Sequence, residues 1–273
     1  DGSHSYIDET GTGGLSIRTG DLYLRNPSNA DFIYCQSGGF VKLYHNGNQR
    51  LETTSTGVTI SGILVADEGI DASDAQYNTR VGANAGDSFT GTDATENTLV
   101  GYGAGTAITT GDYNTCLGTS SAVALTTGGQ NTAVGRNALG TATTASQNTA
   151  IGYYALKNNT SGTYNVAVGN NALDANTTGQ ANTAIGHYAL VANATGSHNT
   201  AVGAYALDAA NTGDYNVALG REALGANTSG DYNVGLGAYA GWKTTTGDYN
   251  VSVGGNALFD NTTGDRNTAI GHE

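Results

Sequence analysis

The stretch Asn182-Thr183-Ala184-Ile185-Gly186 is one copy of a phrase, Asn-(Thr/Val)-x-(Val/Ile/Leu)-Gly, that decides the fold. The phrase occurs twelve times: the second copy follows the first after 19 residues, and every later copy follows after 17. Its asparagines are Asn78, Asn97, Asn114, Asn131, Asn148, Asn165, Asn182, Asn199, Asn216, Asn233, Asn250 and Asn267. A short fixed period is typical of a solenoid, in which each repeat stacks only on its neighbours.

Positions within the repeat are numbered here from this asparagine as zero. Position +1 is Thr or Val and +3 is Val, Ile or Leu, so the two share one face of a strand, which we expect to point into the coil. Position +2 is a small residue in the later copies and lies on the opposite face. Ala at +7 and Leu at +8 predict a second strand, giving two strands and two corners per coil.

Two columns of the repeat are interpreted as structural. Glycine at +4 suits a corner with positive φ or close backbone approach, and the best-defined copies are Gly135, Gly152, Gly169, Gly186, Gly203 and Gly220. Asparagine side chains at position zero can hydrogen-bond each other along the column and satisfy the corner backbone, as expected for Asn131, Asn148, Asn165, Asn182, Asn199 and Asn216.

The fold class is therefore all-β: a parallel β-roll or β-solenoid of about 12 coils over residues 78–273. Residues 1–70 form a separate β-rich module, and residues 71–77 connect the two. In the module, alternating apolar residues predict strands at 15–17 and 22–24. Further strands are expected at 32–34, 40–44, 51–54, 58–60 and 63–65, with turns at 26–29 and at Asn46-Gly47.

Composition narrows the function classes. The chain has 42 Gly, one Pro, 12% charged residues and a formal net charge of −13, with no basic patch for nucleic acid or an anionic membrane. It contains no apolar run of membrane-spanning length and no visible signal peptide. It does not begin with Met and stops inside the twelfth repeat, so we expect a fragment of a longer or processed chain.

Oligomerisation follows from the size of the coil. A 17-residue coil has a thin interior and leaves one face uncovered, and small +2 residues such as Ala167, Ala184 and Ala201 would let another column pack closely there. The usual solution is a closed cyclic assembly. The first three repeats carry Arg80, Leu99 and Cys116 at +2 and are expected to form a transition or cap.

The repeated Asn-Thr-Ala-Ile-Gly phrase resembles the head repeats of YadA-like trimeric adhesins, over residues 78–273. The resemblance implies a left-handed roll and a homotrimer. The 17-residue period is longer than that of the adhesin heads, which predicts a larger outer turn. Residues 39–47 and 50–58 resemble segments of bacteriophage tail fibres. That resemblance implies a virion tail protein whose partners are its own copies, other tail components and a host surface glycan.

The sequence contains few residues in the patterns that catalytic sites require. The five histidines have no metal-ligand spacing, no phosphate-binding loop follows any glycine run, and no cofactor or metal is expected. Cys35 and Cys116 give no disulfide framework, and Cys116 replaces an alanine, so a small buried thiol is expected. We therefore expect a non-enzymatic protein.

Aromatic and acidic residues recur just before the repeat asparagine of three successive late repeats: Asp214, Tyr215, Asp231, Tyr232, Asp248 and Tyr249. Stacked coils would align them about 5 Å apart. Such rows could bind a glycan, with Trp242 nearby in sequence. Alternatively, the tyrosines stack on each other and the aspartates cap backbone amides. Calcium on the Asp row is left open.

The leading hypothesis is a trimeric phage tail-fibre segment that mediates or supports adsorption to the host surface. A bacterial trimeric cell-surface adhesin is the alternative, and it would place the protein on the cell surface. Thr columns such as Thr177-Thr178 and Thr262-Thr263 also suggest an ice-binding solenoid, although Ala194 and Asn211 interrupt them. A polysaccharide-degrading tailspike would need a unique carboxylate pair, which regular repeats do not offer.

Overall fold

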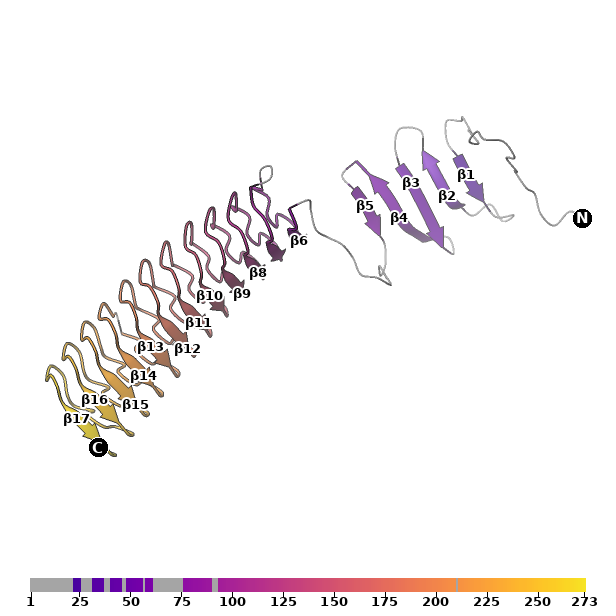
Figure 1. The fold of residues 1–273 in the computed structure, drawn as a ribbon. Coiled ribbons are helices and arrows are strands. Elements are labelled where there is room, and N and C mark those ends of the chain that lie inside the picture. The colour runs from indigo at the N-terminus through magenta and orange to yellow at the C-terminus, as the bar shows by residue number, and fades with distance from the viewer. Residues whose placement is uncertain are drawn as a thin grey trace, which may run out of the picture. The chain divides into compact units, whose positions relative to one another are not determined.

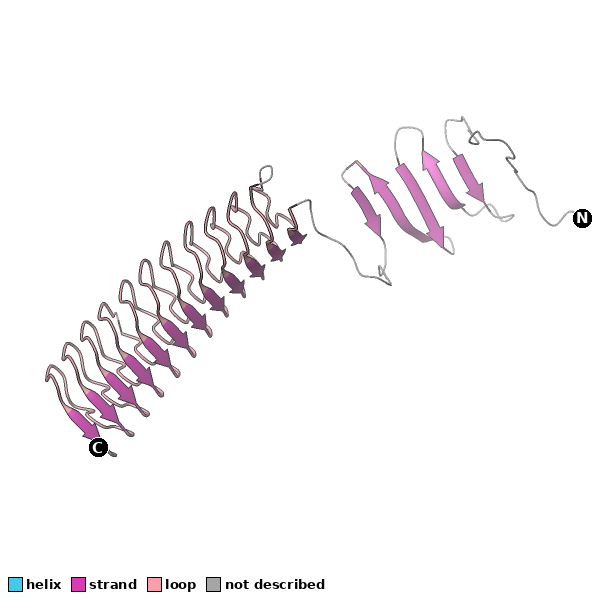
Figure 2. Ribbon diagram, in the orientation of Figure 1, coloured by secondary structure: helices cyan, strands magenta, loops and turns pink. Residues whose placement is uncertain are grey.

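The computed structural model describes residues 22–25, 31–36, 40–45, 48–55, 57–60, 76–89, 93–209 and 211–273. The chain divides into two units, Asp1–Ile70 and Asp71–Glu273. The described residues form strands and turns and contain no helix (Figures 1 and 2).

The first unit contains a five-stranded antiparallel sheet in the order β1-β2-β3-β4-β5. The strands are β1 (Leu22–Arg25), β2 (Asp31–Gln36), β3 (Phe40–His45), β4 (Asn48–Thr54) and β5 (Gly57–Ile60). Five predicted strands are thus confirmed, and His45 pairs with Asn48 across the expected hairpin. The predicted strands at 15–17 and 63–65 and both predicted turns lie outside the described residues.

The second unit is a solenoid whose twelve strands form one parallel sheet, β6 to β17, stacked in sequence order (Figure 1). Neighbouring strands pair in register, with Ala150 opposite Ala167 and Ala167 opposite Ala184. The strands are β6 (Thr79–Val81), β7 (Thr98–Val100), β8 (Thr115–Leu117), β9 (Thr132–Val134), β10 (Thr149–Ile151), β11 (Val166–Val168), β12 (Thr183–Ile185), β13 (Thr200–Val202), β14 (Val217–Leu219), β15 (Val234–Leu236), β16 (Val251–Val253) and β17 (Thr268–Ile270). The predicted parallel β-solenoid is confirmed.

The predicted facing of the strand is wrong. The +2 residues, such as Ala167 and Ala184, are fully buried inside the coil, whereas Val166, Val168 and their equivalents at +1 and +3 point outward. The interior of the later coils is narrow: a Cβ added at Gly235 would lie 3.0 Å from the Ala240 carbonyl oxygen and 3.0 Å from the Leu224 side chain. Where Leu at +8 fills the interior, the inward residue at +2 is therefore small, and because +2 is buried inside the coil, the predicted packing of a second subunit against +2 is excluded.

The second predicted strand is also wrong, because positions +5 to +8 form turns. Leucine at +8 is buried in the left-handed region, with φ of 55° at Leu173 and 50° at Leu190. This conformation is unfavourable for a bulky residue. It is held by burial and by hydrogen bonds between coils, such as that from the Leu173 amide to the Ala189 oxygen at 3.0 Å.

The +4 glycines occupy corners as predicted, with φ between 122° and 140°. Each corner also stacks closely on the next coil. A Cβ at Gly186 would lie 2.6 Å from the Gly203 carbonyl oxygen, closer than real side chains allow. Both the backbone conformation and the contact therefore require glycine. The other five glycines of the predicted set, Gly135, Gly152, Gly169, Gly203 and Gly220, share this geometry.

The predicted asparagine ladder is present and buried. The Asn199 Oδ1 accepts from the Asn216 backbone amide at 2.9 Å and from its Nδ2 at 3.2 Å. The Asn199 Nδ2 donates to the Gly213 carbonyl at 2.8 Å. The asparagine side chain at position zero thus accepts a hydrogen bond from the backbone of the next coil and donates one to the backbone of its own outer turn. The same pattern of amide acceptance links Asn131, Asn148, Asn165, Asn182, Asn199 and Asn216.

A second asparagine ladder at position +11 did not emerge from the sequence. Asn176 donates to Asn159 Oδ1 at 2.9 Å, and Asn193 donates to Asn176 Oδ1 at 3.0 Å. The ladder ends at Asn193, whose Oδ1 is buried without a partner. In the following coil the buried asparagine is Asn211, one position later, and its Nδ2 is also unpaired. The two coils are therefore mismatched at this point.

The early coils keep a filled interior by exchanging large and small residues. In the coil of Asn97, Leu99 at +2 and Ile108 at +11 are buried around Gly105 at +8. A Cβ on Gly105 would lie 2.8 Å from both side chains. Later coils instead place Leu at +8 between smaller neighbours. In the first coil, Arg80 lies over the Phe89 ring, 5.4 Å from its centroid. The first repeats are thus a transition, as expected, in which the large buried side chains stand at +2 and +11 and not at +8.

The two cysteines give a test of this interior. Cys116 is fully buried at +2, and burial raises its pKa to about 12, whereas Cys35 is half-buried. We expect iodoacetamide at pH 8 to label Cys35 in the native protein and Cys116 only after denaturation, because the thiolate reacts. Peptide mass spectrometry would locate the label. Equal labelling of both thiols in the native state would contradict the assigned interior.

Candidate functional site: surface columns of the late coils

The aromatic column at position −1 is a continuous stack. Rings of His198, Tyr215, Tyr232 and Tyr249 follow each other at centroid distances of 4.7, 4.9 and 5.0 Å, with interplanar angles of 2°, 4° and 1°. The Arg266 guanidinium lies 5.3 Å from the Tyr249 centroid and extends the column by a cation–π contact. Each residue has φ of 56–60°, so the corner backbone aims all five side chains alike.

The aspartate column at position −2 caps backbone amides between coils. Oδ1 of Asp231 accepts from the Asp214 amide at 2.7 Å, and Oδ1 of Asp248 accepts from the Asp231 amide at 2.8 Å. Asp214 and Asp265 do the same for the amides of Ser197 and Asp248. This bonding offsets the repulsion between successive carboxylates and gives the column a structural role.

The stack determines what the tyrosines can offer a ligand. Tyr215 and Tyr232 each have a ring on both faces, yet each remains 45% exposed. The exposed parts are therefore ring edges and hydroxyls, which bind by hydrogen bonds and not by stacking on a sugar. Burial, followed by the neighbouring tyrosines and aspartates, raises the pKa of Tyr232. A tyrosine hydroxyl is a hydrogen-bond donor at neutral pH, because the ordinary pKa of the group is about 10.

Trp242 lies in another column. It stands at +9, where its ring stacks on Phe259 at 5.2 Å and 20°. Around it are Tyr239, whose hydroxyl donates to Glu222 at 3.5 Å, and Asp208. Sequence reasoning missed this cluster because positions +6 and +9 vary from coil to coil, and a periodic search selects constant positions.

The outward face of the β6–β17 sheet, here called the outer sheet face, carries no charge. Its members are the +1 and +3 residues: Thr or Val at +1, and Val, Ile or Leu at +3 in every strand. Leu117, Ile185 and Leu219 are 40–47% exposed. Its +3 residues form an aliphatic row along all twelve strands, which makes this face a candidate interaction surface, because monomeric proteins rarely expose large contiguous apolar patches.

The threonine columns have structural partners. Thr160 and Thr177 each donate a side-chain hydrogen bond at 3.0 Å, to the carbonyl oxygens of Thr177 and Ala194 in the next coil. Thr245 bonds Thr262 in the same way. These hydroxyls brace the outer turn, which leaves fewer free donors for an ice lattice than the sequence suggested.

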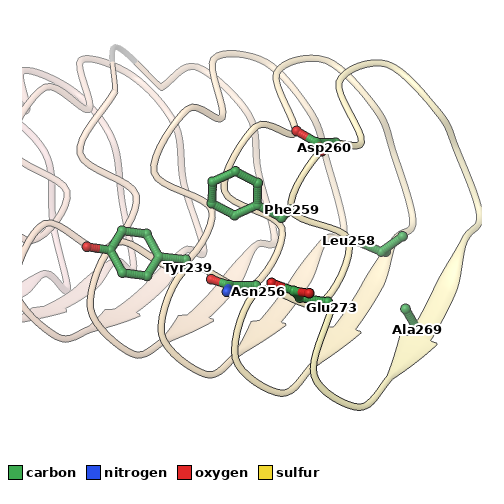
Figure 3. A pocket seen from close by; sticks show the side chains of 7 residues that line it. All are labelled: Tyr239, Asn256, Leu258, Phe259, Asp260, Ala269 and Glu273. Carbon is green, nitrogen blue, oxygen red and sulfur yellow. The ribbon is translucent and has the colours of Figure 1, made fainter.

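A hollow of about 850 Å³ opens at the last coil (Figure 3). Its lining residues are Tyr239, Asn256, Leu258, Phe259, Asp260, Ala269 and Glu273. Leu258 and Ala269 stand at +8 and +2, which are buried under the following coil elsewhere. The hollow is therefore lined in part by positions that lie inside the coil elsewhere. Its lining residues form no recognisable catalytic or metal-binding group.

Metal and membrane features are sparse in the described ranges. There, no group of three or more His, Cys, Asp or Glu side chains could hold a metal ion. No helix among the described residues is long and apolar enough to cross a membrane. Comparison with protein-family models, curated proteins and solved structures found no match to this chain.

Proposed function

We propose that the solenoid is a segment of a homotrimeric fibre whose three copies pack side by side through the outer sheet face. The observation that carries this proposal is the absence of charge along that face, from Thr79 and Val81 to Thr268 and Ile270. Twelve strands at about 4.8 Å spacing give a strip on the order of 55 Å long. Burying such a strip against copies of itself removes it from water.

A cyclic arrangement suits the geometry. Every coil presents the same two outward positions, so parallel copies can match each other coil by coil along the whole strip. Three copies close around an axis and leave no strip exposed, whereas an open arrangement would continue to add chains. The adhesin-like repeat phrase supports three as the number of copies.

Within this proposal the fibre belongs to a phage virion tail, outside the cell, and mediates or supports adsorption to the host. The tail-fibre-like segments at 39–47 and 50–58 support this assignment over a bacterial surface adhesin. Its partners are then its own copies, other tail components and a surface glycan. The role is mechanical and adhesive, and we propose no catalytic activity.

Charge placed on the outer sheet face tests the assembly. We expect Val134→Lys, Val168→Lys and Val202→Lys together to convert a trimer into a folded monomer, because three ammonium groups per chain cannot be buried unpaired. Multi-angle light scattering gives the mass, and circular dichroism confirms that the solenoid remains folded. Tyr164→Lys, on the exposed turn column, is the matched control. A monomeric parent protein would refute the proposal.

An ice-binding role competes for the same surface. Eight of the twelve +1 positions are Thr, all outward on a regular parallel sheet, including Thr132, Thr149, Thr183 and Thr200. Ice binding requires this face to be open, whereas the fibre covers it. Inhibition of ice recrystallisation by a monomeric protein would favour the ice-binding alternative.

Adhesion through the tyrosine column is tested separately. We expect Tyr215→Ser, Tyr232→Ser and Tyr249→Ser together to weaken adsorption to host cells or to their isolated surface polysaccharide, because three aligned phenol hydroxyls per subunit are lost. Light scattering must show that the variant keeps its assembly state. Unchanged adsorption would make this column a purely structural part of the fibre shaft.

A further inference from the structure

A second hollow, of about 240 Å³, opens on the outer turns of successive early coils. It is lined at position −2 by Asp112 and Gly129, at −1 by Tyr113 and Gln130, and at +13 by Thr110 and Thr127. We call these six residues the Gly129 hollow. Because Gly129 has no side chain, it leaves space between Asp112 on one side and Ser146, the −2 residue of the next coil, on the other.

Gly129 interrupts the row of backbone caps at position −2. In the late coils the −2 carboxylate accepts from the −2 amide of the preceding coil, as Asp231 does for the Asp214 amide at 2.7 Å. The hydroxyl of Ser146 does the same for the Gly129 amide at 3.1 Å. Gly129 offers no such oxygen, and within the described residues the Asp112 amide has no acceptor. The Asp112 N–H is therefore a free donor at the hollow.

The threonines of the hollow also have hydroxyls without protein partners. Thr126, at +12, donates to a carbonyl oxygen of the next coil at 2.9 Å. Thr110 and Thr127, at +13, are exposed, and their hydroxyls bond no other residue in the part of the chain that the structure describes. Oδ1 of Asp112 accepts from the Thr95 amide at 2.8 Å, and Oδ2 of the same carboxylate stays open to a ligand.

These groups select a neutral ligand with several hydroxyls. The hollow offers the Asp112 N–H as a donor, the Asp112 carboxylate as an acceptor, and threonine hydroxyls that can do both. A hydroxyl group likewise donates and accepts. Phosphate or sulfate would be repelled by the carboxylate. A calcium ion needs about six oxygen ligands or more, and it has no use for an N–H donor.

Tyr113 supplies ring surface beside these polar groups. It is 54% exposed, and it makes no ring contact with another described residue. Its neighbours in the −1 column are Glu96 and Gln130, whereas Tyr232 has a ring on both faces. The hollow is smaller than pockets for drug-sized ligands, which measure about 300–1,000 Å³. A single sugar residue of a longer chain therefore suits it.

We propose that the Gly129 hollow binds one residue of a saccharide. A sugar hydroxyl accepts from the Asp112 amide, in the role that the −2 side chain has in other coils, while Thr110 and Thr127 bond further hydroxyls and Tyr113 contacts the apolar side of the ring. The hollow uses neither the late tyrosine column nor the outer sheet face, so this site does not depend on the fibre assembly.

Binding is measured on the intact chain. A printed array of bacterial and other glycans identifies the best ligand, which is then titrated by isothermal calorimetry. Sodium phosphate and calcium chloride, each titrated alone, serve as the anionic and cationic probes. Light scattering on the same samples records the assembly state, so failure of the trimer is distinguished from failure of this site.

Two pairs of variants locate the bound sugar. Gly129→Ser places a hydroxyl in the hollow, as Ser146 does in the next coil, and Gly255→Ser is the same change at a distant surface turn. Neither glycine has a positive φ. Thr127→Val removes one hydroxyl of the hollow, and Thr178→Val removes its +13 counterpart three coils later. Thermal melting shows that each variant is folded.

We expect saturable saccharide binding that Gly129→Ser weakens about tenfold or more and Thr127→Val about threefold or more, in line with the loss of single hydrogen bonds. The two controls should bind like the parent. The proposal is overturned if no glycan binds, if controls and hollow variants lose affinity equally, or if phosphate or calcium alone saturates the site. Binding lost only in the variant with Tyr215, Tyr232 and Tyr249 replaced would assign it to the tyrosine column instead.

Discussion

The Gly186→Val variant is expected to lose most of the thermal stability of the solenoid. Valine would have to adopt the φ of 137° found at this corner, and its Cβ would lie 2.6 Å from the Gly203 carbonyl oxygen. Strained backbone of this kind costs about 1–3 kcal/mol, and the overlap with the next coil adds to it. The coils on either side would have to separate, so stacking is lost as well as local geometry.

Thr178→Val is the control for this prediction. Thr178 is exposed in the outer turn of the preceding coil, where substitutions usually change stability by less than about 0.5 kcal/mol. Thermal melting followed by circular dichroism would compare both variants with the parent. A similar fall in melting temperature for the two would show that the corner assignment is wrong.

The Asn199→Ala variant is expected to be destabilised by about 3 kcal/mol or more. It removes the acceptor of the Asn216 amide and the donor to the Gly213 oxygen, leaving two buried backbone groups unpaired. Each unsatisfied group costs about 1–3 kcal/mol. The effect should exceed that of an ordinary polar truncation, because the ladder is continuous and has no alternative partner at this level.

Chemical denaturation would measure this loss. Asn158→Ala is the matched control, since Asn158 is a half-buried surface residue that bonds only Asp174 at 3.3 Å. We expect its midpoint to stay close to that of the parent. A control as unstable as Asn199→Ala would mean that the ladder contributes nothing beyond a surface hydrogen bond.

The sequence predicted the features that depend on constant positions. The 17-residue period established the parallel register, Gly186 established the corner, and Asn182 established the buried ladder, because each requirement recurs in every coil. In the first unit, β1 followed from local alternation of apolar residues, and β2 to β5 followed from short apolar segments between turn residues.

The sequence could not show which strand face points inward. Val166 and Val168 are more apolar than Ala167, and hydrophobicity alone predicts that they are buried. In the later coils the opposite holds because Leu at +8 fills the interior and leaves space only for a small residue at +2, whereas Leu99 is buried at +2 in a coil that has Gly105 at +8. Likewise Ala-Leu at +7 and +8 is compatible with a strand, and only the stacked coils show that Leu173 adopts a positive φ.

The candidate site residues likewise fall into those at constant positions of the repeat, which the sequence predicted, and those at variable positions, which it did not. The rows of Tyr232 and Asp231 follow from the period, and their ring stacking and amide capping agree with the structural alternative that the sequence predicts. The cluster of Trp242, Phe259 and Tyr239 did not follow, because positions +6 and +9 vary from coil to coil. The contact between Trp242 and Phe259 depends on the stacking of two successive coils.

Most of the later coils bury the same residue types at +2, +7 and +8, and this similarity affects how coils pair in the correct order during folding. Consecutive coils such as those of Asn165 and Asn182 have the same buried residues, so a coil can be looped out and its neighbours stacked directly with little mismatch. Lengthening a loop twofold costs only about 0.6 kcal/mol of chain entropy, which discriminates weakly against such a skip. The free energy gained by burying the coil that would be left out must therefore provide most of the preference for the correct stack. The early coil that buries Leu99 and Ile108 has an interior unlike that of the later coils. It can stack correctly in only one place, and it therefore sets the register of the coils that follow.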